Sequence, residues 1–183
     1  MFKKIILATA LISASAIQIT MASPVPYVGV STGITTTTGN HFSGFRGMSL
    51  NIFAGYGGIV SQSFYLAGEL TGTLATAEVT DSNALKTTYG YALGILPGIM
   101  LSDHTLAFAR VGIARARFSE ADATRTGGQI GLGLQTSLTQ NVDLRGEYDF
   151  TAYQSVNRNV NGVNLTAAPR NDAFTLGLIY KID

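Results

Sequence analysis

Four charged residues, Glu69, Arg110, Arg145 and Glu147, stand out because they are interspersed with glycine, threonine and aliphatic residues in a chain with only 13% charged residues. Two carboxylates and two guanidinium groups can form a buried ion-pair network, or they can line a gate or a proton path. Isolated charges are costly in an interior of low dielectric, so we expect a structural network that fills an enclosed space. The gate is the alternative, and it predicts a single-channel conductance that changes in Glu69→Ala.

The charged residues lie in segments whose polarity alternates with the period of a β-strand. In residues 141–150, Arg145 and Glu147 fall on one parity and Leu144 and Tyr148 on the other. Eight such runs occur, at residues 25–34, 46–56, 64–74, 88–101, 106–118, 128–138, 141–150 and 173–182. Because Glu69 and Arg110 share the parity of the small residues in their own runs, all four charges are expected on one side of one sheet.

The connections between the runs alternate between long and short. Residues 35–44, 75–86 and 154–170 are long and polar, residues 119–125 are intermediate, and residues 57–63, 102–105 and 139–141 are short. An up-and-down barrel with all long loops at one rim requires this order, and outer-membrane barrels have long outer loops and short periplasmic turns. The sequence therefore predicts an all-β fold, an eight-stranded antiparallel barrel closed by pairing its first run with its last.

The same alternation is found in soluble carrier barrels, whose apolar side chains point into the barrel. The composition of the two strand faces therefore has to decide which face points inward. The face opposite the aliphatic residues is rich in Gly, Ser, Thr and Ala, which fit the narrow bore of an eight-stranded barrel. We therefore expect Leu132, Leu134, Leu144 and Leu178 to point outward into lipid, and the charged residues to point inward. A cluster of these four leucines around a central cavity would instead indicate a soluble carrier.

The first residues have the pattern of a secretory signal peptide, with Lys3 and Lys4 before an apolar stretch and small residues up to Ala22. We expect residues 1–22 to be removed and residues 23–183 to form the barrel. The expected mature chain has 10 basic and 11 acidic residues and no cysteine, so it offers no basic field for nucleic acid and no thiolate metal site. After Ala22 no apolar run is long enough for a spanning helix.

Three stretches together resemble a known family: residues 94–114, Leu-Arg-Gly-Glu-Tyr at 144–148, and Thr-Leu-Gly-Leu-Ile-Tyr-Lys-Ile at 175–182. They are similar to the small eight-stranded outer-membrane barrels of Gram-negative bacteria, the OmpA-like and opacity-protein-like group within the porin superfamily. The resemblance implies a cell outer membrane location, an interior network of charges, and insertion by the barrel assembly machinery through the last strand. The family's last strand usually ends on an aromatic residue, whereas here Tyr180 and Ile182 precede Asp183.

Several residues have predicted positions at the membrane interfaces. Arg115 and Arg117 have outward parity late in their run, where we expect contact with lipopolysaccharide phosphates or with water. Pro97 predicts a bulge just before the turn at Ser102, with a loss of alternation over residues 96–101. Aromatic residues are expected in two interface girdles, with Tyr27, Tyr56, Phe64 and Tyr180 at one rim and Phe45, Tyr91, Phe118, Phe150 and Phe174 at the other.

These observations predict a monomeric, non-catalytic surface protein that needs no cofactor and contacts lipid, lipopolysaccharide and a host or cell-surface ligand through four outer loops. One alternative is a lipid A-modifying enzyme, because His41, Ser43 and Asp81-Ser82 occur in loops in an order similar to the outer-membrane palmitoyltransferase. His104 belongs to a turn at the other rim, so no histidine pair has metal-ligand spacing. A second alternative is a small pore or a conduit for hydrophobic solutes, which requires a continuous cavity.

Overall fold

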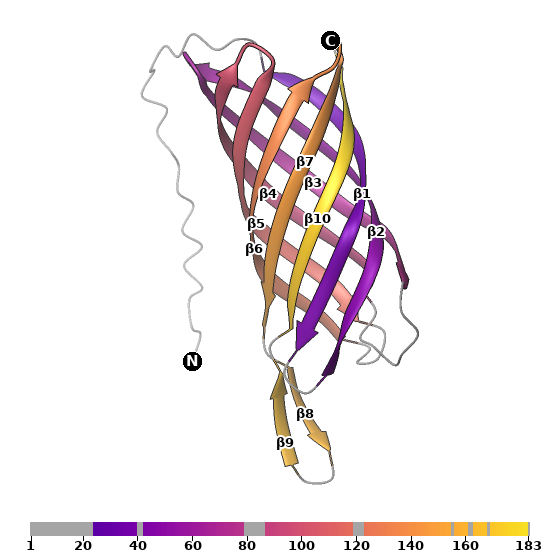
Figure 1. The fold of residues 1–183 in the computed structure, drawn as a ribbon. Coiled ribbons are helices and arrows are strands. Elements are labelled where there is room, and N and C mark those ends of the chain that lie inside the picture. Colours follow the sequence, from indigo (N-terminus) through magenta and orange to yellow (C-terminus); the bar gives the residue numbers. More distant parts are fainter. Residues whose placement is uncertain are drawn as a thin grey trace, which may run out of the picture.

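A computed structural model describes residues 24–39, 42–78, 87–118, 123–154, 156–160, 163–167 and 169–182. It contains a closed eight-stranded barrel and a separate two-stranded hairpin (Figure 1). The strands are β1 (Val25–Gly39), β2 (Phe42–Ser61), β3 (Phe64–Glu78), β4 (Thr87–Ser102), β5 (Thr105–Phe118), β6 (Ala123–Ser137), β7 (Val142–Tyr153), β8 (Val156–Val160), β9 (Val163–Ala167) and β10 (Arg170–Lys181). No helix in the described ranges is long and apolar enough to span a membrane.

The barrel strands are antiparallel neighbours in chain order, and β1 pairs with β10 to close the ring. The turns at residues 62–63, 103–104 and 138–141 lie at one rim, which we call the short-turn rim. The opposite rim, the loop rim, carries the β8–β9 hairpin, which projects beyond the barrel in Figure 1. The predicted eight-stranded up-and-down barrel is therefore confirmed.

The strands are longer than the alternating runs, so several predicted connections are shorter than expected: β3 continues to Glu78 and β6 begins at Ala123, and two further connections differ more strongly. Residues 35–44 were expected to be a long loop, but Thr37 pairs with Phe45 and Gly39 with Phe42. The β-branched threonines of this segment favour extended backbone, which carries the ladder beyond the apolar residues. Residues 57–63 are likewise strand as far as Ser61, and Gln62 makes the turn with a φ of 37°.

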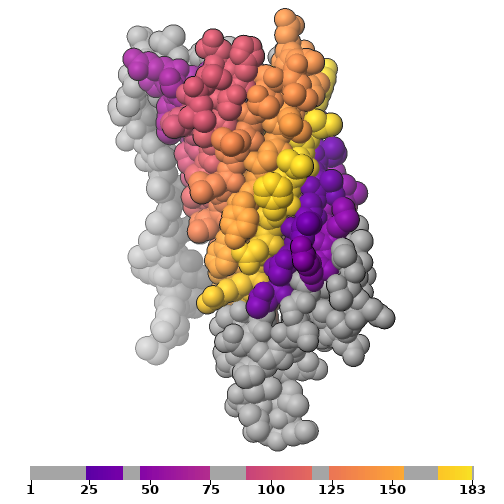
Figure 2. Space-filling view, viewed as in Figure 1, coloured from indigo at the N-terminus to yellow at the C-terminus, as the bar shows by residue number. Residues whose placement is uncertain are grey.

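The outer face of the barrel is apolar along its whole circumference. Val30, Leu70, Ile95 and Leu132 are between 53% and 68% exposed, while the residues between them point inward and are buried or half-buried. Leu134, Leu144 and Leu178, which together with Leu132 distinguish a membrane barrel from a soluble carrier, also lie on this outer face. The orientation of a soluble carrier is therefore excluded. In the space-filling view the coloured strands form a continuous wall (Figure 2).

Pro97 does not interrupt the alternation as predicted. Leu96 is fully buried and Ile99 is exposed, so the parity continues past Pro97, and the register with β5 is the same on both sides of it. What changes over this segment is the chemistry of the inner face, because the inward residue is a leucine instead of a small residue. The register of β4 and β5 shifts between Met100 and Ser102, just before the turn, where the sequence predicted a bulge.

Candidate functional site: the charged interior

The structure brings Glu69, Arg110, Arg145 and Glu147 together in the middle of the bore, and each of the four is at least 94% buried. They come from β3, β5 and β7, strands that are not neighbours in the barrel. Asp149 joins them from β7, since its Oδ1 lies 3.5 Å from Arg110 Nε. We call these five residues the charge cluster.

Glu69 is the centre of the charge cluster and is held from three directions. Its Oε1 accepts a hydrogen bond from Arg110 Nη2 at 2.5 Å, and its Oε2 accepts bonds from Arg145 Nη1 at 2.6 Å and from the Tyr27 hydroxyl at 2.8 Å. The bond to Arg145 crosses the full width of the barrel, because β3 and β7 stand opposite each other in the ring. These contacts satisfy the carboxylate as a buried charge requires.

Arg110 makes a forked contact with the second carboxylate. Its Nε and Nη2 donate to Glu147 Oε1 and Oε2 at 2.5 and 3.1 Å, which is the paired geometry that makes guanidinium–carboxylate bonds strong. Its remaining nitrogen, Nη1, is buried without a hydrogen-bond partner among the described residues. The charge cluster holds three carboxylates and two guanidinium groups, so Asp149 is the carboxylate in excess.

Glycines make room for these side chains on the neighbouring strands. Gly131 pairs with Asp149 across β6 and β7, and a Cβ atom there would lie 2.2 Å from Asp149 Oδ1. Gly55 and Gly94 pair with Glu69 on its two sides. The inward glycines of the sequence thus make space for the charged side chains.

Aromatic rings surround Arg145 on the side of the short-turn rim. Its guanidinium carbon lies 4.9 Å from the centroid of Phe108, 5.0 Å from Phe53 and 5.6 Å from Tyr27, which are cation–π distances. Each ring covers a glycine of the adjacent strand: a Cβ at Gly133 would lie 2.3 Å from Phe108, with equally close approaches at the glycines paired with Phe53 and Tyr27. We call these three residues the aromatic layer.

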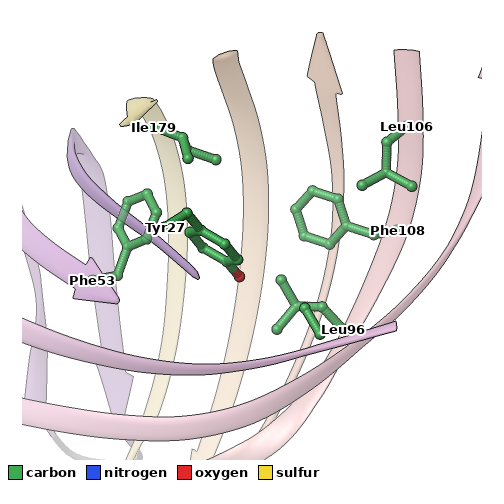
Figure 3. Packing of buried hydrophobic residues seen from close by; sticks show 7 residues of the cluster. Tyr27, Phe53, Leu96, Leu106, Phe108 and Ile179 are labelled. Carbon is green, nitrogen blue, oxygen red and sulfur yellow. The ribbon is translucent and has the colours of Figure 1, made fainter. Parts of the chain in front are cut away.

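The aromatic layer continues into an apolar plug near the short-turn rim. Leu96, Leu106 and Ile179 are 0%, 5% and 1% exposed and pack with the rings in one cluster (Figure 3). Figure 3 shows these side chains pointing into the bore from different strands. Aliphatic and aromatic side chains therefore fill this half of the barrel.

A polar chain runs beside the apolar plug to the short-turn rim. Arg145 Nη2 donates to Gln135 Oε1 at 2.9 Å, Gln135 Nε2 donates to Asp143 Oδ2 at 2.7 Å, and Lys181 Nζ lies 3.0 Å from Asp143 Oδ1. Lys181 is partly exposed and ends this chain at the rim. Gln135, Asp143 and Lys181 were not among the predicted site residues, although the alternation gives each of them inward parity.

The half of the bore toward the loop rim is polar and less filled. A cavity of about 110 Å³ lies there, floored by the charge cluster and lined by serine, threonine, asparagine and glutamine side chains together with alanine, glycine and aromatic residues. Asn51 is typical of the lining, since it accepts a hydrogen bond from Thr73 and donates to Ser31. Gln129 Oε1 and Asp149 Oδ1 are buried there without hydrogen-bond partners in the described ranges. Buried polar atoms without hydrogen-bond partners beside a cavity of this size are suited to binding water, and we call this cavity the vestibule.

The other predicted site residues lie outside this cluster. Arg115 is on the outer face of β5 near the loop rim and is exposed, and His104 is exposed in the turn between β4 and β5. The side chains of Arg117 and Ser43 are outside the described part, and so are residues His41, Asp81 and Ser82. The convergence of the residues of the predicted enzyme is therefore untested and stays a prediction.

One aromatic assignment was wrong. Tyr27 was expected in the interface girdle, but it is 5% exposed and belongs to the aromatic layer. Its parity on β1 is that of the inward residues Gly29 and Ser31, so the alternation already indicated an inward side chain. Tyr56, Tyr91, Phe174 and Tyr180 lie on the outer face as expected, and Phe64 is also exposed. The side chains of Phe45 and Phe118 are outside the described part.

Within the described ranges, no group of three or more His, Asp or Glu side chains is arranged to hold a metal ion. The carboxylates of the charge cluster are instead bound to guanidinium groups. A closed antiparallel barrel with an apolar outer face and a charged, side-chain-filled interior defines the class of small transmembrane β-barrels.

Comparison with known proteins agrees with this class. The family model described as "Outer membrane protein beta-barrel domain" matches residues 5–181, so the chain belongs to this family and is located in the outer membrane. No curated protein matches the sequence.

Solved structures of two outer-membrane proteins are among those with a similar fold. The crystal structure of Neisserial surface protein A (NspA) matches with a TM-score of 0.56 and 18% identity, over 86% of this chain and 97% of that chain. Ail, the attachment invasion locus protein of Yersinia pestis, matches with a TM-score of 0.54 and 14% identity, over 87% of this chain and 99% of that chain. A structure of Ail in complex with the heparin analogue sucrose octasulfate matches with a TM-score of 0.54 and 13% identity, over 87% of this chain and 99% of that chain.

Proposed function

We propose that this protein is a non-catalytic surface protein that acts as a single copy, and that its loop rim binds a ligand on host or other cells. The observation that carries the proposal is the filled bore. The charge cluster and the apolar plug occupy the middle of the barrel and its short-turn half, so we expect the interior to support the wall and not to conduct solutes. The loop rim is then the part of the molecule that meets the outside of the cell.

The β8–β9 hairpin is the part of the loop rim that extends furthest in Figure 1. Its strands pair from Val156 with Ala167 to Val160 with Val163, as a sheet of its own. An isolated two-stranded hairpin is only marginally stable in water, and a partner that packs on it supplies the missing contacts. The likeness to a protein named for attachment and invasion also supports a role in surface binding.

The test combines cell binding with electrical recording. Cells that express the protein should bind to host-cell monolayers or to immobilised heparin, and replacing residues 156–167 by a short Gly-Ser linker should reduce this binding at least fivefold. Equal surface expression and heat-modifiable gel migration of both forms are the control. Binding that does not depend on the hairpin or on any other loop-rim segment would refute the proposal.

A small pore is the second candidate, because the vestibule and the polar chain from Arg145 to Lys181 together approach both rims. We expect a planar bilayer with the purified protein to show no single-channel conductance, since the charge cluster separates the vestibule from the short-turn half. A conductance that changes in Glu69→Ala would support the gate instead.

A further inference from the structure

Three residues that line the vestibule each have a buried polar atom without a hydrogen-bond partner in the described part of the chain. The atoms are Arg110 Nη1, Gln129 Oε1 and Asp149 Oδ1. Arg110 is only 3% exposed, and its other two nitrogens are already bonded to Glu147 and Glu69. A buried polar atom without a partner costs stability, so these three atoms indicate a place where a bound molecule supplies the missing hydrogen bonds.

The three residues come from consecutive strands and surround one position of the sheet. Gly131 on β6 pairs with Arg110 on β5 and with Asp149 on β7, and Arg110 Nε lies 3.5 Å from Asp149 Oδ1. Gln129 also lies on β6, one inward position closer to the loop rim than Gly131. Such diagonal neighbours on adjacent strands are about 7–8 Å apart, within reach of one ligand. One small molecule at this point can therefore contact all three residues.

The free atoms differ in kind, and this difference selects the ligand. Gln129 Oε1 and Asp149 Oδ1 are acceptors, whereas Arg110 Nη1 is a positively charged donor. A metal cation would suit the two oxygens but would be repelled by the guanidinium group, and an anion would be repelled by the excess carboxylate of the charge cluster. A hydroxyl group both donates and accepts. A neutral molecule with neighbouring hydroxyl groups therefore satisfies all three atoms.

The remaining lining of the vestibule suits a sugar. Hydroxyl and amide side chains come from the other strands, among them Ser49 and Thr71. Phe53 and Tyr153 also line it, and the electron-rich faces of aromatic rings attract the C–H groups of a sugar ring. Pockets for drug-sized ligands measure about 300–1,000 Å³. The vestibule, at about 110 Å³, therefore has room for one sugar unit and not for a longer chain.

The vestibule is accessible from one side of the membrane. Its lining includes Asn171, the second residue of β10 at the loop-rim end of that strand. At the other end the charge cluster and the apolar plug fill the bore. A sugar therefore has to enter from the loop rim.

We propose that the vestibule binds one neutral sugar unit, whose neighbouring hydroxyl groups donate to Asp149 and Gln129 and accept from Arg110. This inference rests on the proposed function, because it names the class of ligand that the protein meets on other cells, the end of a neutral glycan. The charge cluster then has a second role, since its excess carboxylate and its free guanidinium nitrogen form the floor of the site. A sulfated sugar is disfavoured here because it would place a negative charge beside Asp149.

The test is saturation-transfer NMR of the protein in phospholipid nanodiscs, titrated with methyl glucoside and methyl galactoside. Detergents with sugar headgroups are avoided because they would compete. The wild type should bind at least one of the two glycosides, and Gln129→Leu, which removes one acceptor, should weaken the binding at least fivefold. Gln135→Leu is the matched control, because Gln135 lies on the same strand but bonds to Asp143 and Arg145 and does not line the vestibule, and it should bind like the wild type.

Two results would overturn the sugar site. A folded wild type that binds neither glycoside would show that the vestibule holds only water, and equal binding by Gln129→Leu would show that the sugar binds elsewhere. Heat-modifiable migration checks folding, and Gln129→Met, with an unbranched side chain of similar length, replaces Gln129→Leu if that variant does not fold.

The sugar site and the proposed function can fail separately. Replacing residues 156–167 should leave glycoside binding unchanged, because none of them lines the vestibule. Mild periodate oxidation of the host-cell surface cleaves neighbouring hydroxyl pairs and should lower cell binding at least twofold. Glycoside binding together with cell binding that resists periodate would overturn the assignment to a glycan and identify a free sugar as the ligand.

Discussion

Removal of the Glu69 carboxylate should destabilise the barrel more than any other single change in the charge cluster. In Glu69→Ala, Arg145 loses its ion pair within the described residues, and Arg110 keeps only its contacts with Glu147 and Asp149. Breaking one buried pair and leaving its partner charged costs about 3–5 kcal/mol. The Tyr27 hydroxyl also loses its acceptor, which costs a further 1–3 kcal/mol or so for a buried donor.

A double-mutant cycle separates the interaction energy between Glu69 and Arg145 from the cost of leaving one of the two charges unpaired. Replacing Glu69 and Arg145 together by leucine removes both charges, so the double variant should be more stable than the sum of the two single effects predicts, by at least about 2 kcal/mol. Urea unfolding in lipid vesicles gives the free energies. Because the chain has no tryptophan, circular dichroism and heat-modifiable migration are the suitable readouts. The reasoning fails if Glu69→Ala stays within about 1 kcal/mol of the wild type, or if the cycle shows no coupling.

Other predictions concern single positions. Gly131→Val should destabilise the barrel by about 1–3 kcal/mol or prevent folding, because its Cβ meets Asp149, whereas Gly128→Ala on the same strand should be neutral in the same urea titration. Gln62→Gly should stabilise the turn by about 0.5–1 kcal/mol, since Gln62 has a positive φ; a loss of stability would contradict this. Leu132→Arg should cost about 2–4 kcal/mol near the membrane midplane, and a neutral effect on vesicle insertion and unfolding would argue that this face does not meet lipid.

The alternation of the sequence predicts which side chains point inward, and it does so for nearly every described strand position. It contains no information about height along the bore, because the height depends on how each strand is shifted against its neighbours. Asp149 shares the parity of Arg145 and Glu147, yet only the registers of β5 with β6 and of β6 with β7 place it beside Arg110. Tyr27 lies near the start of its strand and was therefore expected at an interface, although its hydroxyl reaches Glu69 in the middle of the barrel.

The sequence also does not reveal which side chain fills the space over each inward glycine. Glycines opposite Phe53, Phe108 and Tyr27 indicated a crowded interior, but not which side chain occupies each space. Those pairs are cross-strand neighbours, so they follow from the register and not from distance in the chain. The loop lengths were predicted less well, since polar threonines were interpreted as loop where the ladder continues.

The bond from Glu69 to Arg145 joins opposite walls of the ring, and together with Tyr27 and Arg110 it connects β1, β3, β5 and β7. These bonds can form only at one barrel width, so the charge cluster fits a barrel of this circumference. A cylinder with one more hairpin would be wider, the two walls would move beyond reach of each other, and the guanidinium group would be stranded without its counter-ion. The interior of this protein therefore favours a barrel of eight strands over one of ten, and a chain with one hairpin duplicated would first have to replace this central ion pair.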